Sequence, residues 1–249
     1  MAPTELILSD ITRMDPGLCI IGIARDGDRF RSVRPGPPVG HAWSAEFPYR
    51  RGDRLRFQLT PAAAEPPHLE DHSSNGLIEQ AGRVEEAELV DCLRRAEVAG
   101  SLRDLYRTTV HVQRRGAFIW PSRSAVRSVC GVNPPRVRLK LEANEIRAGI
   151  ALPSGESLPD LPVVDRSWHN FGQTALAEMP GANRAQRLNR FLSDLFTGVE
   201  VERLFVRIGV TRPKGRRCWL MVDSLFPMPR KSWLDALLRG EPPPTGSSK

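Results

Sequence analysis

The chain has 249 residues, and with 40% hydrophobic residues it can bury a substantial core as one large or two small domains. Lysine and arginine outnumber aspartate and glutamate by 36 to 29, and the net charge of +7 favours polyanionic partners. No segment reaches the roughly 18 apolar residues of a membrane span, and four scattered cysteines without CxxC spacing fit a reducing compartment, so we expect a cytoplasmic protein without a membrane partner.

β-Strands separated by turn-forming residues are predicted along most of the chain. Asp-Gly at residues 26–27 predicts a hairpin, and residues 52–61 alternate apolar and basic side chains with the period of a one-sided strand. Arginines would form the solvated face of these strands. The predicted strands are residues 5–11, 18–24, 29–33, 52–61, 108–112, 117–120, 137–141, 146–152, 201–211 and 218–226.

Helical spacing of apolar residues is confined to two segments. Residues 84–96 form a short helix ended by Gly100, and residues 184–198 place five large apolar side chains on one face, with Gly198 as the C-terminal stop. The proline- and acid-rich residues 62–76 are predicted to be a link between elements.

Two β-rich halves predict a mainly β, α+β fold made of two small OB-like barrels with one or two short helices. The oligonucleotide/oligosaccharide-binding (OB) fold is a five-stranded barrel of suitable size, although the strand pattern is also compatible with β-sandwich folds. The predicted domains are residues 1–125 and 126–238, followed by a disordered tail at 239–249.

Three sequence motifs resemble those of the bacterial dual OB-containing domain family. They are ITRMDPGLCIIGIARDGDRFRSVRP at residues 11–35, PPHLEDH at residues 66–72 and VRIGVTRPKGRRCWLMVDSLFP at residues 206–227. One departure is Phe30, where relatives more often have tryptophan. The resemblance implies two OB domains and an association with nucleic acid in bacterial conflict systems.

Arginine-rich strands and loops are the candidate nucleic-acid contacts, because cationic side chains neutralise phosphates and aromatic faces stack on bases. The alternatives are an ordinary solvated surface or an arginine content that reflects codon bias. Trp43 is expected at an exposed loop tip, whereas Phe30, Trp120, Trp168 and Trp219 are stacking candidates that more often belong to a core. The candidate contacts are Arg13, Arg31, Arg34, Arg54, Arg56, Trp43, Arg207, Arg212, Lys214, Arg216 and Arg217.

His68, Glu70, Asp71 and His72 lie close together in the sequence and invite a metal-dependent nuclease interpretation. Their spacing matches neither HExxH nor an EF-hand loop, and the two preceding prolines disfavour a helix that would align the histidines. We favour a structural role in which the carboxylates pair with Arg13 or Arg34.

The sequence contains neither a phosphate-binding glycine loop nor a GxSxG motif. We therefore consider an enzyme less favoured and expect no cofactor. The sequence therefore predicts a nucleic-acid-binding protein, and the resemblance to the dual OB-containing domain family implies an accessory subunit of a bacterial defence system. Two alternatives remain: a metal-dependent nuclease or nucleic-acid-modifying enzyme, and an assembly subunit that docks an acidic protein partner. Charge alone does not separate DNA from RNA or single strands from duplexes.

Overall fold

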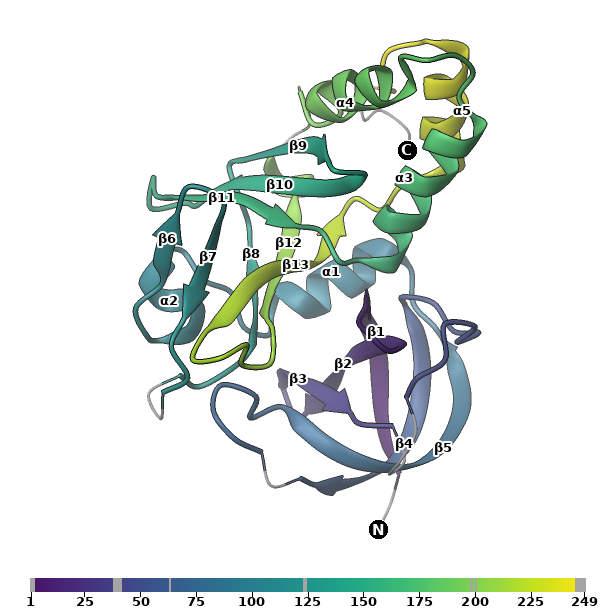
Figure 1. Ribbon diagram of the computed structural model, residues 1–249. Helices are drawn as coiled ribbons and strands as arrows, with labels where there is room; N and C mark the ends of the chain where they lie inside the picture. Colours follow the sequence, from purple (N-terminus) through teal and green to yellow (C-terminus); the bar gives the residue numbers. More distant parts are fainter. Residues whose placement is uncertain are drawn as a thin grey trace.

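The computed structural model describes residues 3–37, 42–62, 64–122, 125–197, 199 and 201–244, with only the backbone at 77, 78 and 201. The fold is mainly β, and the strands are distributed over several sheets (Figure 1). In the described part of the chain, no helix is long and apolar enough to cross a membrane.

The first five strands pair in a circuit that returns to its starting strand. Their order is β1-β2-β3-β5-β4, and β4 pairs again with β1. The β3–β5 pairing is parallel, and the other pairings are antiparallel. Leu6, Leu8, Leu55 and Phe57 form the core that this sheet encloses. The strands are β1 (Thr4–Arg13), β2 (Leu18–Asp26), β3 (Arg29–Pro35), β4 (Asp53–Pro61) and β5 (Asp71–Arg83).

The remaining strands, which we call the second half together with α2 to α5, form two sheets. A five-stranded sheet has the order β6-β7-β13-β12-β8, and a three-stranded sheet has the order β11-β10-β9. The second predicted barrel is therefore not confirmed. The strands are β6 (His111–Gln113), β7 (Gly116–Ile119), β8 (Val129–Val132), β9 (Arg136–Glu142), β10 (Glu145–Ala151), β11 (Ser157–Pro162), β12 (Phe205–Val210) and β13 (Cys218–Phe226).

Helices cover much of the apolar surface of the second half, which explains how its sheets are buried without closing. Trp168 of α3, Leu188 of α4 and Trp233 of α5 share one core with residues of both sheets. The described residues contain five α-helices and a short 3₁₀ helix, more than the one or two helices predicted. They are α1 (Glu86–Arg94), α2 (Leu102–Tyr106), α3 (Arg166–Glu178), α4 (Arg184–Asp194), η1 (Val201–Arg203) and α5 (Lys231–Arg239).

Helix α1 lies between the first sheet and the second half (Figure 1). Its Leu89 and Leu93 pack in one apolar cluster with Ile23 of β2 and with Phe205 and Phe226 of the second half. Burial of each leucine stabilises this junction by about 1.5–3 kcal/mol. The two halves are therefore joined by a continuous apolar contact.

Several predictions about local structure differ from the fold. Strand β5 and α3 occupy segments for which no strand or helix was predicted, and α5 extends to Arg239, the first residue of the predicted tail. The predicted helix stop Gly198 and the end of the tail, residues 245–249, lie outside the described residues.

Candidate functional site

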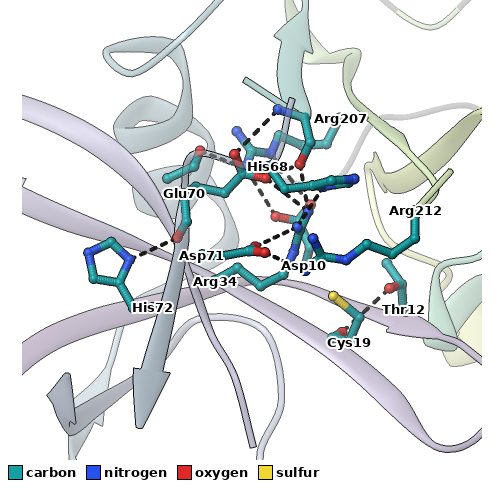
Figure 2. A network of polar contacts seen from close by, with 12 residues as sticks. Asp10, Thr12, Cys19, Arg34, His68, Glu70, Asp71, His72, Arg207 and Arg212 are labelled. Atoms are coloured by element: carbon teal, nitrogen blue, oxygen red, sulfur yellow. Dashed lines mark hydrogen bonds and ion pairs between the residues drawn. The ribbon is translucent and has the colours of Figure 1, made fainter. Parts of the chain in front are cut away.

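A cluster of charged side chains is buried between the first sheet and the second half, and we call it the seam (Figure 2). At its centre Arg207 of β12 donates hydrogen bonds to both carboxylate oxygens of Asp10 of β1, at 3.4 and 3.2 Å. Both side chains are 0% exposed. Burial opposes the charge of Arg207, but Asp10 raises the pKa of its guanidinium above the ordinary value. Arg207 therefore remains a cation that the protein itself neutralises.

Arg34 of β3 is the second cation of the seam. Its guanidinium donates to Asp71 Oδ1 at 2.8 Å and to Ser128 Oγ at 2.8 Å, and it pairs with Glu70 Oε1 at 3.0 Å. Ser128 also donates to Glu70, so this carboxylate connects the two halves. The structure thus shows Arg34, and not Arg13, as the partner of the two carboxylates.

His68, Glu70 and Asp71 offer ligand atoms within 4.8 Å of one another. His72 is turned away from them, and its Nδ1 lies 2.9 Å from the backbone carbonyl oxygen of Glu70 (Figure 2). Arg34 contacts all three clustered side chains, including His68 Nδ1 at 3.1 Å. A divalent cation would have to replace this guanidinium, so the residues fit an ion-pair cluster better than a metal centre.

The ionisation of the cluster follows from burial and from its arginines. Burial, followed by the positive charges of Arg34 and Arg212, lowers the pKa of His68 to about 3, so the imidazole is neutral at physiological pH. Burial, followed by the negative charge of Asp10, raises the pKa of Asp223 to about 8. Asp223 is therefore mostly protonated at pH 7, which limits repulsion among the carboxylates of the seam.

A second buried ion pair joins the halves at Arg51 and Asp165. Arg51 Nη1 lies 2.7 Å from Asp165 Oδ2, and both side chains are almost fully buried. The same carboxylate caps α3 by accepting a hydrogen bond from the backbone N–H of Ser167 at 2.8 Å. Sequence reasoning missed this pair, although an aspartate directly before a helix with apolar periodicity is a recognisable cap signal.

Three of the predicted phosphate contacts are exposed but have partners on the protein surface. Arg13 lies 2.8 Å from His169 Nδ1. Arg54 pairs with Glu88 at 3.2 Å, and Arg56 pairs with Glu5 at 3.4 Å. Exposed pairs of this kind contribute at most about 1 kcal/mol and exchange readily. Arg31 is also exposed, and it has no ion pair among the residues that the structure describes.

Three predicted nucleic-acid contacts, Trp43, Arg34 and Arg207, are buried or mostly buried, and the expected exposure of Trp43 is wrong. Trp43 is only 8% exposed, and its indole N–H donates to the backbone carbonyl of Pro35 at 3.1 Å. Its ring packs edge-on against Phe57 within the first core, so it is not at a loop tip. Arg34 and Arg207 face the seam because each has a buried carboxylate as its partner.

The connection between β12 and β13, residues 212–217, carries four exposed or half-exposed cations, and we call it the basic hairpin. Arg212 is 60% exposed and pairs with Asp71 at the edge of the seam. Lys214 and Arg216 are exposed and have no ion pair within the described part of the chain. The guanidinium of Arg217 lies 4.6 Å from the ring centre of Phe118 and 5.6 Å from that of Trp120. The loop therefore combines free cations with aromatic rings.

Comparison with known proteins assigns no family to this chain. No family model and no curated protein sequence matches it. One solved structure that matches is a murine DNA-binding protein bound to double-stranded DNA. That protein is 9% identical, with a TM-score of 0.31 over 91% of this chain and 97% of that chain. At this TM-score the likeness establishes neither a common fold nor a common ligand.

Proposed function

We propose that this protein binds nucleic acid through the basic hairpin. The observation that carries the proposal is that Lys214 and Arg216 are exposed without an acidic partner among the described residues. Of the other candidate arginines, Arg31 is also exposed without an ion pair among the described residues, whereas Arg34, Arg54, Arg56 and Arg207 are paired with carboxylates. The hairpin differs from Arg31 in holding four cations within one short loop. Four cations in six residues repel one another, and a phosphate backbone would relieve that repulsion while it releases counterions.

We also propose that β1 to β5 form an OB-like barrel, as the closed order β1-β2-β3-β5-β4 supports. OB folds bind oligonucleotides on the face of strands 2 and 3 and on the loops between strands 1 and 2 and strands 4 and 5. Here Ile23 of β2 and Phe30 of β3 pack towards α1, and the β4–β5 connection carries His68 and Glu70 into the seam. The β2–β3 face and the β4–β5 connection are thus partly engaged within the protein, whereas the β1–β2 connection is exposed, with Met14 at 51%. The exposed cations of the hairpin make it the better candidate for contact with phosphates.

The proposal can be tested by fluorescence anisotropy with labelled single-stranded and duplex DNA and RNA at several salt concentrations. We compare the wild type with a Lys214→Ala, Arg216→Ala double variant. Each lost phosphate contact reduces the slope of log affinity against log salt by about 0.7 for single strands and 0.9 for duplex DNA. The double variant should therefore reduce the slope by about 1.4 to 1.8 if both side chains contact phosphates.

A matched control removes the same charge at a different place. Arg184 and Arg190 are exposed on α4 and have no ion pair among the described residues, so Arg184→Ala, Arg190→Ala should leave the slope unchanged. Equal loss in both double variants would indicate attraction by overall charge and would count against the hairpin. Absence of salt-dependent binding by the wild type to any of the four nucleic acids would overturn the proposed function.

A further inference from the structure

Four aromatic rings gather beside the basic hairpin, and we call them the aromatic platform: His111, Phe118, Trp120 and Trp219. His111 stacks on Phe118 with ring centres 5.0 Å apart and an interplanar angle of 16°. Phe118 also contacts Trp120 and Trp219, at 5.3 Å in each case. The rings are contributed by β6, β7, the residue after β7 and β13, so the sheet holds them in place.

Trp120 is the exposed member of the platform. It is 41% exposed, whereas Trp43 and Trp168 are buried in the two cores. Large aromatic side chains gain more from burial than other residues, so an exposed tryptophan beside cations is an informative exception. Sequence reasoning included Trp120 among several candidates, and the structure distinguishes it by its exposure.

The rings around Trp120 leave it without a parallel neighbour. Its interplanar angles are 84° with Phe118 and 72° with His111, which are edge arrangements. No described ring stacks parallel to its indole, so a flat ligand could adopt the offset-stacked arrangement without displacing one. The guanidinium of Arg217 lies over the indole, 5.6 Å from its centre, so a base would stack on the opposite face with this positive charge behind the ring.

The platform and the basic hairpin are adjacent because β13 pairs with β7 directly after the hairpin ends. Trp219 pairs with Phe118, and Cys218 pairs with Ile119, the neighbour of Trp120. Lys214 and Arg216 therefore belong to the loop that leads directly into this pairing. Aromatic faces for bases next to cations for the backbone are the combination found in sites for single-stranded nucleic acid.

We infer that Trp120 stacks on an unpaired base and that the site selects single-stranded nucleic acid over duplex. This inference rests on the proposed function, because it takes the basic hairpin as the phosphate contact. In a duplex each base already stacks on its neighbours inside the helix, so its face is not available to a tryptophan. The phosphates of a duplex would still be available to Lys214 and Arg216.

The test compares a labelled oligothymidylate with a duplex of mixed sequence by anisotropy, using wild type, Trp120→Ala and Trp120→Phe. Loss of one base–aromatic stack should weaken single-strand binding by about 5- to 150-fold in Trp120→Ala, with most of the loss restored in Trp120→Phe. The affinity for the duplex should change less than about twofold, because Trp120 does not stack on a base of a duplex. Because Trp120 also packs against Phe118 and His111, binding is measured well below the thermal midpoint of each variant, which circular dichroism determines.

Val98→Ala provides a control, since Val98 is an exposed apolar residue between α1 and α2, away from the platform and the basic hairpin. It should bind both probes like the wild type. Unchanged single-strand affinity in Trp120→Ala, or an equal loss for single strand and duplex, would overturn the inference. In either case a reduced salt slope of the Lys214→Ala, Arg216→Ala variant would still support the proposed function, so the two failures are distinguishable.

Discussion

Replacement of Arg207 by methionine tests whether the seam is a structural ion-pair cluster and not a nucleic-acid contact. Methionine keeps much of the length of the side chain but removes its charge. In the native protein Arg207 makes two hydrogen bonds to Asp10 and one to Ser32 Oγ at 3.0 Å. The variant would leave the fully buried carboxyl group of Asp10 without its cationic partner.

The expected cost follows from the complete burial of both partners. Because neither side chain is exposed, solvent cannot screen the lost interaction. Removal of one partner from a buried pair costs about 3–5 kcal/mol in the free energy of unfolding. For a protein of this size, each kcal/mol lowers the thermal midpoint by about 2–4 °C, so Arg207→Met should lower it by about 6–20 °C.

A double-mutant cycle separates the pair from general damage to packing. The Asp10→Asn, Arg207→Met variant removes both charges, so it should be more stable than Arg207→Met alone. The control is Arg54→Met at an exposed ion pair, which should cost at most about 1 kcal/mol. A shift in Arg207→Met no larger than in this control would refute the buried-pair account. A folded Arg207→Met variant with weakened nucleic-acid binding would show that Arg207 reaches the ligand.

Two further predictions concern other buried residues. Because the pKa of Asp223 is raised to about 8, its contribution to stability is fully present below about pH 4 and is lost as the pH rises to about 8. Asp223→Asn should therefore gain stability relative to the wild type between pH 5 and pH 8, which urea unfolding at each pH measures; a pH-independent difference would show that Asp223 is already ionised. Trp43→Ala should lower the free energy of unfolding by about 3–5 kcal/mol while the folded fraction keeps the wild-type affinity for nucleic acid, and a stable variant with reduced affinity would restore Trp43 as a contact.

Local patterns predicted the elements whose side chains alternate clearly. The β2–β3 hairpin turns at Gly27, whose φ of 60° suits glycine, and β4 alternates as expected with Leu55 and Phe57 inside. Strand β5 was missed because its sequence, DHSSNGLIEQAGR, has few apolar residues and no alternation. It is stabilised by pairing with β4 and β3, which no local window contains.

The candidate site was only partly predictable, because charge is visible in a sequence but the partner of each charge is not. Arg207 and Asp10 are separated by 197 positions, and Arg34 and Ser128 by 94. Arg207 and Arg216 were both predicted to contact nucleic acid, although one is buried and the other is exposed. A signal was available for Asp10, since it interrupts the apolar run of a strand and therefore needs a buried partner.

The ion pairs at the junction of the two halves remove four arginines from the unpaired positive charge of the protein. Arg207 balances Asp10, Arg51 balances Asp165, and Arg34 with Arg212 balances Glu70 with Asp71. These pairs contribute nothing to the net charge of +7, so the excess is carried by residues outside them. Lys214 and Arg216 contribute two of these charges within three residues of each other, beside an exposed tryptophan. The buried arginines join the two halves, and under the proposed function the exposed cations of the basic hairpin attract the polyanion.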